Sequence, residues 1–123
     1  MVLVDTSVWI DHLRAPHRPL EHLLEDAQVV IHPMVIGELA CGNLQQRQKL
    51  MELWMSLPRA VEATHAEALH CLEKNHLMGR GIGFIDLHLL ASALLTPDTR
   101  LWTRDLRLQK ISKELDLCWE MLH

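Results

Sequence analysis

Short runs of consecutive apolar residues alternate along the chain with longer segments in which apolar residues recur every three or four positions. The runs 2–4, 28–32 and 100–103 are typical of strands buried on both faces, whereas three-and-four spacing is typical of helices. Strands that alternate with helices predict parallel βαβ units with right-handed crossovers. We therefore expect one α/β domain that covers residues 1–123.

The segment 44–57 has an unusually wide apolar face, which extends over more than half of its circumference. Packing against one sheet needs a narrower apolar face, so we interpret this face as a candidate partner surface with Trp54 as its anchor.

Thr64 and Glu67 fit a capping box at the start of the next helix. Two short runs, 60–63 and 117–119, are candidate strands. The expected helices are 8–13, 20–27, 33–42, 44–57, 64–78, 84–95 and 105–116.

Composition restricts the classes of protein that fit. Hydrophobic residues make up 49% and charged residues 23%, which indicates a compact globular chain. The net charge of −4 excludes a protein that binds nucleic acid by its overall charge, so a polyanion would need a local basic patch or a metal ion. The three cysteines lack C-x-x-C spacing, and no apolar run is long enough for a signal peptide or a membrane span. We therefore expect a cytoplasmic protein with reduced thiols.

Four acids stand where an apolar element should not favour a charge. Asp5 follows the first strand, Glu38 lies in the helix after the second, Asp86 lies in the most apolar helix, and Asp105 follows 100–103. Each has a purely local interpretation. Asp5 and Asp105 could cap helices, Asp86 could favour the first turn of its helix, and Glu38 could face solvent.

Together the four acids predict a metal site. The ends of parallel strands meet at one edge of a sheet, where ligands of such folds bind. Two carboxylates about 6 Å apart repel by roughly 3 kcal/mol at an effective dielectric of 20, and no lysine or histidine lies beside these acids in the sequence. Mg²⁺ or Mn²⁺ would offset this repulsion, and such ions promote cleavage of phosphodiesters. Thr6, Ser7 and Thr103 could hydrogen-bond the acids or only form turns.

The segment 100–113 contains five basic residues and one acid. Arg100, Arg104 and Arg107 are therefore candidates for contacts with the phosphates of a nucleic acid, although a solvated helix face would have the same composition. One phenylalanine and no tyrosine argue against a platform for stacked bases. The nine histidines show no H-E-x-x-H motif, and we interpret them as structural.

Four sequence blocks resemble the PIN domain, in particular the VapC-type toxins of bacterial toxin–antitoxin pairs. The blocks are D-T-S-V-W-I from Asp5, G-E-L-A-C-G from Gly37, G-I-G-F-I-D-L-H-L-L-A-S-A from Gly81, and L-W-T-R-D-L-R-L from Leu101. Their order and joint spacing carry the resemblance. It implies a three-layer α/β/α fold with a central parallel sheet of about five strands.

The resemblance also implies a function. It implies a Mg²⁺-dependent endoribonuclease, with Mn²⁺ as a substitute ion, that acts on an RNA substrate. It further implies a homodimer that is held inactive by a cognate DNA-binding antitoxin. The catalytic and metal-binding acids of the family match Asp5, Glu38, Asp86 and Asp105, and its hydroxyl positions match Thr6, Thr103 and Ser7.

Two other classes stay open from the sequence. A receiver-like signalling module also carries acids at strand ends, but it would need a lysine near the last strand, where none is found. A catalytically silent PIN-like binding subunit would be expected to have lost acids, and all four are present.

Overall fold

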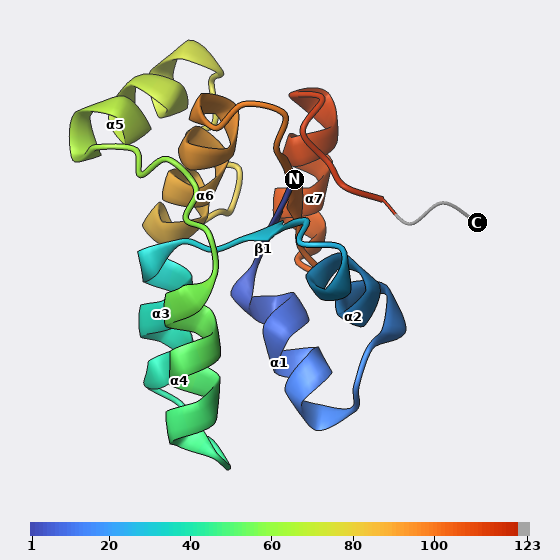
Figure 1. The fold of residues 1–123 in the computed structure, drawn as a ribbon. Helices are drawn as coiled ribbons and strands as arrows, with labels where there is room; N and C mark the ends of the chain where they lie inside the picture. Colours follow the sequence, from blue (N-terminus) through green and yellow to red (C-terminus); the bar gives the residue numbers. More distant parts are fainter. Residues whose placement is uncertain (121–123) are drawn as a thin grey trace.

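Three parallel strands form the centre of the molecule in the computed structural model, which describes residues 1–120 (Figure 1). The middle strand β1 (Val2–Val4) pairs with β2 (Val29–Val30) on one side and β3 (Arg100–Trp102) on the other. Single-residue bridges extend both edges, from Ile31 to Arg59 and from Leu101 to Cys118. The sheet therefore has three strands with a further chain segment beside each outer strand, where about five strands were expected.

The helices form two layers with the sheet between them. In Figure 1, β1 lies between α1 and α2 on one side and α6 and α7 on the other. The direction of winding reverses at β1, and right-handed crossovers then place the two sets of helices on opposite faces. The expected α/β/α architecture is confirmed. The helices are α1 (Thr6–Arg14), α2 (Arg18–Glu25), α3 (Pro33–Ala40), α4 (Arg47–Ser56), α5 (His65–Lys74), α6 (Phe84–Leu95) and α7 (Leu106–Glu114).

Two segments, β1 and the middle of α6, are mostly apolar on all sides because they lie inside the core. All of β1 is buried, and α6 is buried continuously from Leu87 to Ala93 because it packs against both α5 and β3. No helix within residues 1–120 has the length and hydropathy that crossing a membrane requires. The capping box of α5 is confirmed, since Thr64 accepts from the Glu67 N–H and Glu67 accepts from the Thr64 N–H.

The strand predicted at 60–63 is wrong. Only Arg59 bridges to the sheet, with the Ala60 N–H donating to the Ile31 carbonyl at 3.0 Å, and the N–H groups of Val61 and Ala63 then donate to side chains in α6 and at its C-cap. Val61 donates to the Thr96 hydroxyl at 2.9 Å and Ala63 donates to the Ser92 hydroxyl at 3.0 Å. At 117–119, likewise, only Cys118 bridges to the sheet, so neither segment extends into a strand.

Trp54 is a core residue and not the exposed interface anchor that the sequence suggested. Its side chain is fully buried and meets Trp9 edge to face, with the ring centroids 6.0 Å apart. Part of the wide apolar face of α4 is thereby used inside the molecule. Leu53 and Met55 stay exposed beside it.

Candidate active site

Asp5 is fixed at the end of β1 by three neighbouring donors. Its carboxylate accepts from the Thr6 N–H at 2.8 Å, from the Ser7 hydroxyl at 2.9 Å and from the Thr103 hydroxyl at 2.7 Å. The side chain is buried, and it caps α1. Thr103 follows β3, so these bonds join the ends of two neighbouring strands. The sequence prediction that hydroxyl side chains support Asp5 agrees with this geometry.

Glu38 reaches the same edge of the sheet from α3. The Thr6 hydroxyl donates to its carboxylate at 2.7 Å, while the Thr6 N–H donates to Asp5. Thr6 therefore lies between two of the predicted acids and bonds to both. Glu38 itself is exposed, as expected for a side chain at the rim of a site.

Asp86 lies in the first turn of α6, where its carboxylate accepts from the Gly83 N–H at 3.2 Å. Burial raises the pKa of this carboxyl above its ordinary value, and the charges of Asp5, Asp105 and Glu38 raise the pKa further against the effect of the Gly83 bond. The other three acids are thus close enough to act on Asp86. Asp86 therefore lies in the same region of the molecule as the other three acids.

Asp105 caps α7 and accepts at one oxygen from the N–H groups of Arg107 and Leu108, each at 3.0 Å. Its own N–H donates to the Thr103 hydroxyl at 3.1 Å. Thr103 therefore links Asp105 to Asp5. The local cap interpretation of Asp105 is confirmed, and it is compatible with a ligand role because the cap uses a single oxygen.

The carboxylates keep free oxygens and lack cationic partners. Within residues 1–120, hydrogen bonds engage one oxygen each of Glu38, Asp86 and Asp105 and leave the other. The ion pairs found there involve none of the four acids. Four carboxylates without a cationic side chain beside them favour the binding of a cation.

A hydrated ion fits this arrangement better than a closed protein cage. Among residues 1–120, no three His, Cys, Asp or Glu side chains converge closely enough to surround a metal by themselves. Mg²⁺ commonly binds through one or two carboxylates and keeps several waters, whereas structural zinc takes four protein ligands. The free oxygens of the carboxylates suit Mg²⁺ held in part through water.

The three predicted arginines occupy different places. Arg104 lies beside the site, where its N–H donates to the Ser7 hydroxyl at 3.1 Å and its guanidinium pairs with Asp11 at 2.6 Å. Arg107 lies against the connector before α6 and donates to the Gly81 carbonyl at 3.4 Å. Gly81 has a φ of +85°, and a Cβ there would lie 2.8 Å from the Arg107 side chain, so the contact requires glycine.

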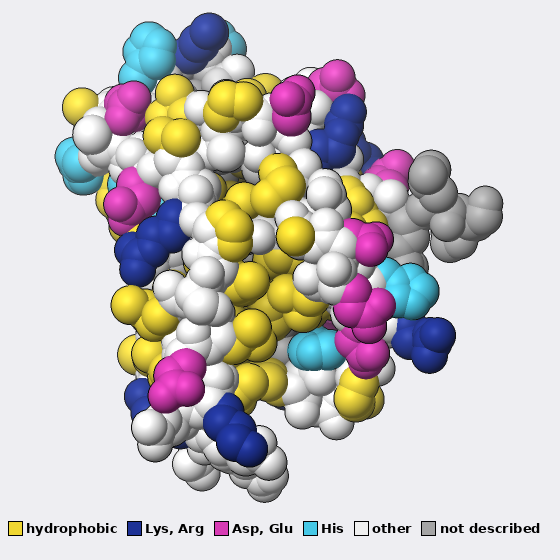
Figure 2. Space-filling model, in the orientation of Figure 1, with side chains coloured by type: hydrophobic (Ala, Val, Ile, Leu, Met, Phe, Trp, Pro, Cys, Tyr) yellow, Lys and Arg dark blue, Asp and Glu magenta, His cyan; other side chains and the backbone are white. Residues whose placement is uncertain are grey.

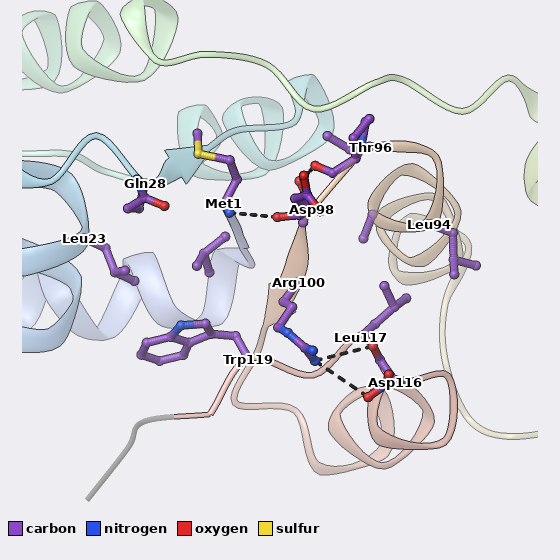
Figure 3. A pocket seen from close by; sticks show the side chains of 14 residues that line it. Met1, Leu23, Gln28, Leu94, Thr96, Asp98, Arg100, Asp116, Leu117 and Trp119 are labelled. Carbon is purple, nitrogen blue, oxygen red and sulfur yellow. Dashed lines mark hydrogen bonds and ion pairs between the residues drawn. The ribbon is translucent and has the colours of Figure 1, made fainter.

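Arg100 lies at the opposite end of β3. Its N–H donates to the Met1 carbonyl, level with the start of β1. Figure 3 shows its side chain beside Asp116, in a pocket of about 580 Å³ that Trp119 also lines. The structure therefore does not bring Arg100 to the acids. Asp11, which orients Arg104, was missed because nothing in the local sequence marks a partner so distant in the chain.

Comparisons with known proteins identify the family of this chain. A family model described as PIN domain matches residues 2–114. The chain is 46% identical to proteins named Ribonuclease VapC32 from two strains of Mycobacterium tuberculosis, over 114 residues that cover 93% of this chain and 92% of each relative. The match extends over the four sequence blocks and all four acids.

Proposed function

Because the chain belongs to the PIN domain family, and within it to the VapC proteins, we propose that it is a Mg²⁺-dependent endoribonuclease and the toxin of a toxin–antitoxin pair. The observation that carries the proposal is the hydrogen bonding at the end of β1, where Thr6 bonds to both Asp5 and Glu38 and Thr103 bonds to both Asp5 and Asp105. These four acids are the proposed catalytic and metal-binding residues. The curated relatives, which are named as ribonucleases, support RNA as the substrate.

The residues of the site have different proposed roles in hydrolysis. Mg²⁺ bound at this site, or Mn²⁺ in its place, would supply a Lewis acid and lower the pKa of a water molecule. Glu38, Asp86 and Asp105 offer free oxygens to hold the ion, while Thr6, Ser7 and Thr103 keep the Asp5 carboxylate in place. In the hydrolysis, a water oxygen would bond to phosphorus as the bond to the leaving oxygen breaks, and the proton lost by the water would pass to that leaving oxygen.

Arg104 and Arg107 are the proposed contacts for RNA phosphates. Both flank Asp105 in the chain, and both side chains are exposed. With a net charge of −4, the protein has to attract RNA through such local cations. Arg100 is excluded from this role because its side chain lies at the other end of the sheet.

A groove beside Glu38 supports the proposal of an antitoxin partner. It has a volume of about 640 Å³, and Glu38 lies at its edge. Figure 2 shows hydrophobic side chains gathered on the face between α4 and the pair α1 and α2. An apolar segment of the antitoxin seated there would bring a basic side chain within reach of the acids. The apolar residues of the groove are Ile10, Leu13, Leu39, Leu44 and Leu50.

The remaining elements of the proposal are a homodimer and a cytoplasmic location. Exposed leucines on two packed helices, Leu69 on α5 and Leu94 and Leu95 on α6, supply apolar area for contact with a second copy. A ribonuclease toxin acts where its RNA target is found, so we place it in the cytoplasm.

The experiment that tests the proposed function is incubation of the purified, antitoxin-free protein with total cellular RNA. We expect cleavage at a few positions with Mg²⁺, no cleavage with EDTA, and loss of cleavage in Asp105→Asn and Glu38→Gln. Asp26→Asn and Glu73→Gln, which change exposed acids elsewhere, should cleave like wild type. No cleavage under either condition would contradict the proposal and favour the catalytically silent binding subunit.

A further inference from the structure

A buried pair of polar side chains, His32 and Ser92, joins the two helices that carry Glu38 and Asp86. Both side chains are almost fully buried, with exposed fractions of 2% and 0%. The His32 Nδ1 accepts from the Met34 N–H at 3.0 Å and its Nε2 lies 3.1 Å from the Ser92 hydroxyl. This pair lies outside the predicted site, and no sequence pattern distinguishes His32 from the other histidines.

The hydrogen bonds define the state of the imidazole. Because the Met34 N–H can only donate, Nδ1 is an acceptor and carries no proton. In the neutral ring the proton is then on Nε2, which donates it to the Ser92 hydroxyl. The same hydroxyl accepts from the Ala63 N–H at 3.0 Å. The neutral Nε2–H tautomer is therefore the form that makes every one of these bonds.

The pair connects elements that have few other links. His32 is the N-cap of α3, and Ser92 lies in the middle of α6. The helix pairs in broad contact are α1 with α3, α3 with α4, and α5 with α6. The combination of α3 with α6 is not among these pairs, so the His32–Ser92 bond is a direct side-chain link between two helices that are not in broad contact.

We propose that His32 and Ser92 are positioning residues that hold Glu38 on α3 at the separation from Asp86 on α6 that one Mg²⁺ requires. The inference rests on the proposed function, since it takes both acids as ligands of the same ion. It goes beyond that function because neither His32 nor Ser92 is among the residues proposed above to bind the metal or RNA, and their hydrogen bonds are to each other, Met34 and Ala63.

A contribution to stability does not by itself explain why His32 and Ser92 are buried together. Burying polar groups costs free energy even when they are hydrogen-bonded, and replacing both partners with apolar groups of similar shape can be nearly neutral. A directional bond, in contrast, fixes a distance and an angle between two helices. Groups that orient metal ligands from outside the first coordination sphere typically affect metal affinity by about 10- to 100-fold.

Two substitutions of His32 separate the bridge from the cap. Asparagine places its amide near the position of Nδ1, so His32→Asn keeps an acceptor for the Met34 N–H and loses the donor to Ser92. Glutamine reaches the position of Nε2, so His32→Gln keeps the donor and loses the cap. Ser92→Ala removes the acceptor of the bridge and also leaves the Ala63 N–H unpaired.

The test compares Mg²⁺ affinity with stability in the full chain. We expect His32→Asn and Ser92→Ala to bind Mg²⁺ about tenfold more weakly than wild type. His32→Gln should bind within about threefold of wild type, although loss of a cap makes it the less stable of the two His32 variants. Thermal unfolding without metal gives the stability, and calorimetric titration with Mg²⁺ gives the affinity.

The ring of His32 gives an independent readout. Burial lowers its pKa, with Glu62 raising it and His88 lowering it, so the neutral ring persists below the ordinary value of 6.5. Long-range ¹H–¹⁵N spectra of the wild-type histidines should show protonated Nε2 and bare Nδ1 for His32 at neutral pH.

The outcomes distinguish failure of the proposed function from failure of the positioning role. Failure of the wild-type protein to bind Mg²⁺ would overturn the proposed function. Mg²⁺ binding by wild type, with the same affinity in folded His32→Asn and Ser92→Ala, would overturn the positioning role alone. Weakening in His32→Gln as large as that in His32→Asn, or larger, would also overturn it, because the Mg²⁺ affinity would then not depend on the bond to Ser92.

Discussion

At the scale of single residues, the local and the functional interpretations of the acids are compatible. Asp5 and Asp105 cap α1 and α7, as their sequence positions suggest. The caps fix each carboxylate at the edge of the sheet, because a side chain that accepts from a helix N-terminus cannot rotate freely. The helix ends thus serve as the means by which the fold places charged groups together.

Replacement of Asp86 by asparagine should separate folding from function. The raised pKa of Asp86 indicates that its charge is unfavourable in the metal-free fold, chiefly because of burial. We expect Asp86→Asn to unfold at the same or a higher temperature than wild type without Mg²⁺, and to lose RNA cleavage by about 100-fold or more. A lower unfolding temperature with full cleavage would contradict the role assigned to Asp86.

The affinity for Mg²⁺ should fall as pH is lowered toward the raised pKa of Asp86. Protons and Mg²⁺ compete for the same carboxylate, so protonation releases the ion. Without Mg²⁺ the linkage has the opposite sign: the folded carboxyl holds its proton more tightly than the unfolded one, so stability falls as pH rises from 3.8 to the folded pKa. Unfolding curves across acidic pH, with and without Mg²⁺, measure both effects, and Asp86→Asn should show a reduced pH dependence in each.

The sequence predicted the four acids and the three hydroxyls, but not how they are connected. Strand ends and capping positions are visible in the order of residues, which is why Asp5 and Asp105 stand out. The bond from Thr6 to Glu38 and the ion pair of Arg104 with Asp11 depend on the angle between helices, which sequence spacing does not contain. Arg100 was grouped with Arg104 and Arg107 because the three are close in sequence. A strand advances about 3.3 Å per residue, so Arg100 at the start of β3 lies far from Thr103 and the acids at its end.

At the scale of elements, the central strands were predictable and the edges of the sheet were not. The run Val2–Val4 is apolar throughout because both faces of β1 are covered. The segment 60–63 has similar composition, yet after Ala60 the N–H groups of Val61 and Ala63 bond to the side chains of Thr96 and Ser92 at the end and in the middle of α6. Whether an apolar run pairs with a strand or with a helix side chain depends on its neighbours in space.

Trp54 should contribute to stability and not to association. Its buried indole packs on Trp9, so Trp54→Ala should lower the free energy of unfolding by about 3–5 kcal/mol. Met55→Ala, at an exposed position on the same helix, should change it by less than about 0.5 kcal/mol. Denaturant titration measures both. A small effect of Trp54→Ala on unfolding, together with a changed oligomeric state, would restore the interface interpretation.

At the scale of the whole molecule, the fold reconciles a negative protein with a negative substrate. The net charge is −4, and the acids at the edge of the sheet add to the repulsion of RNA. Arg104 and Arg107 flank Asp105 in the chain and are exposed, so the proposed function assigns RNA phosphates and a divalent ion to one region. Without the ion, the site would repel the substrate that the proposed function requires.

The apolar surface of α5 and α6 should mediate self-association. Leu94 is 46% exposed near the end of α6, and a charge there would be desolvated in a dimer. We expect light scattering to give twice the mass of one chain for the wild type and a single chain for Leu94→Glu. Leu106→Glu changes a leucine that is 78% exposed on α7, and it should stay dimeric. A monomeric wild type at micromolar concentration would contradict this surface assignment.

The central claim is that the four carboxylates share a divalent cation, and calorimetric titration of the antitoxin-free protein with Mg²⁺ at neutral pH tests it most directly. The account predicts saturable binding by the wild type and by Asp26→Asn, and binding at least about tenfold weaker in Asp5→Asn. Equal Mg²⁺ affinity in wild type and Asp5→Asn, or no binding by either, would contradict it.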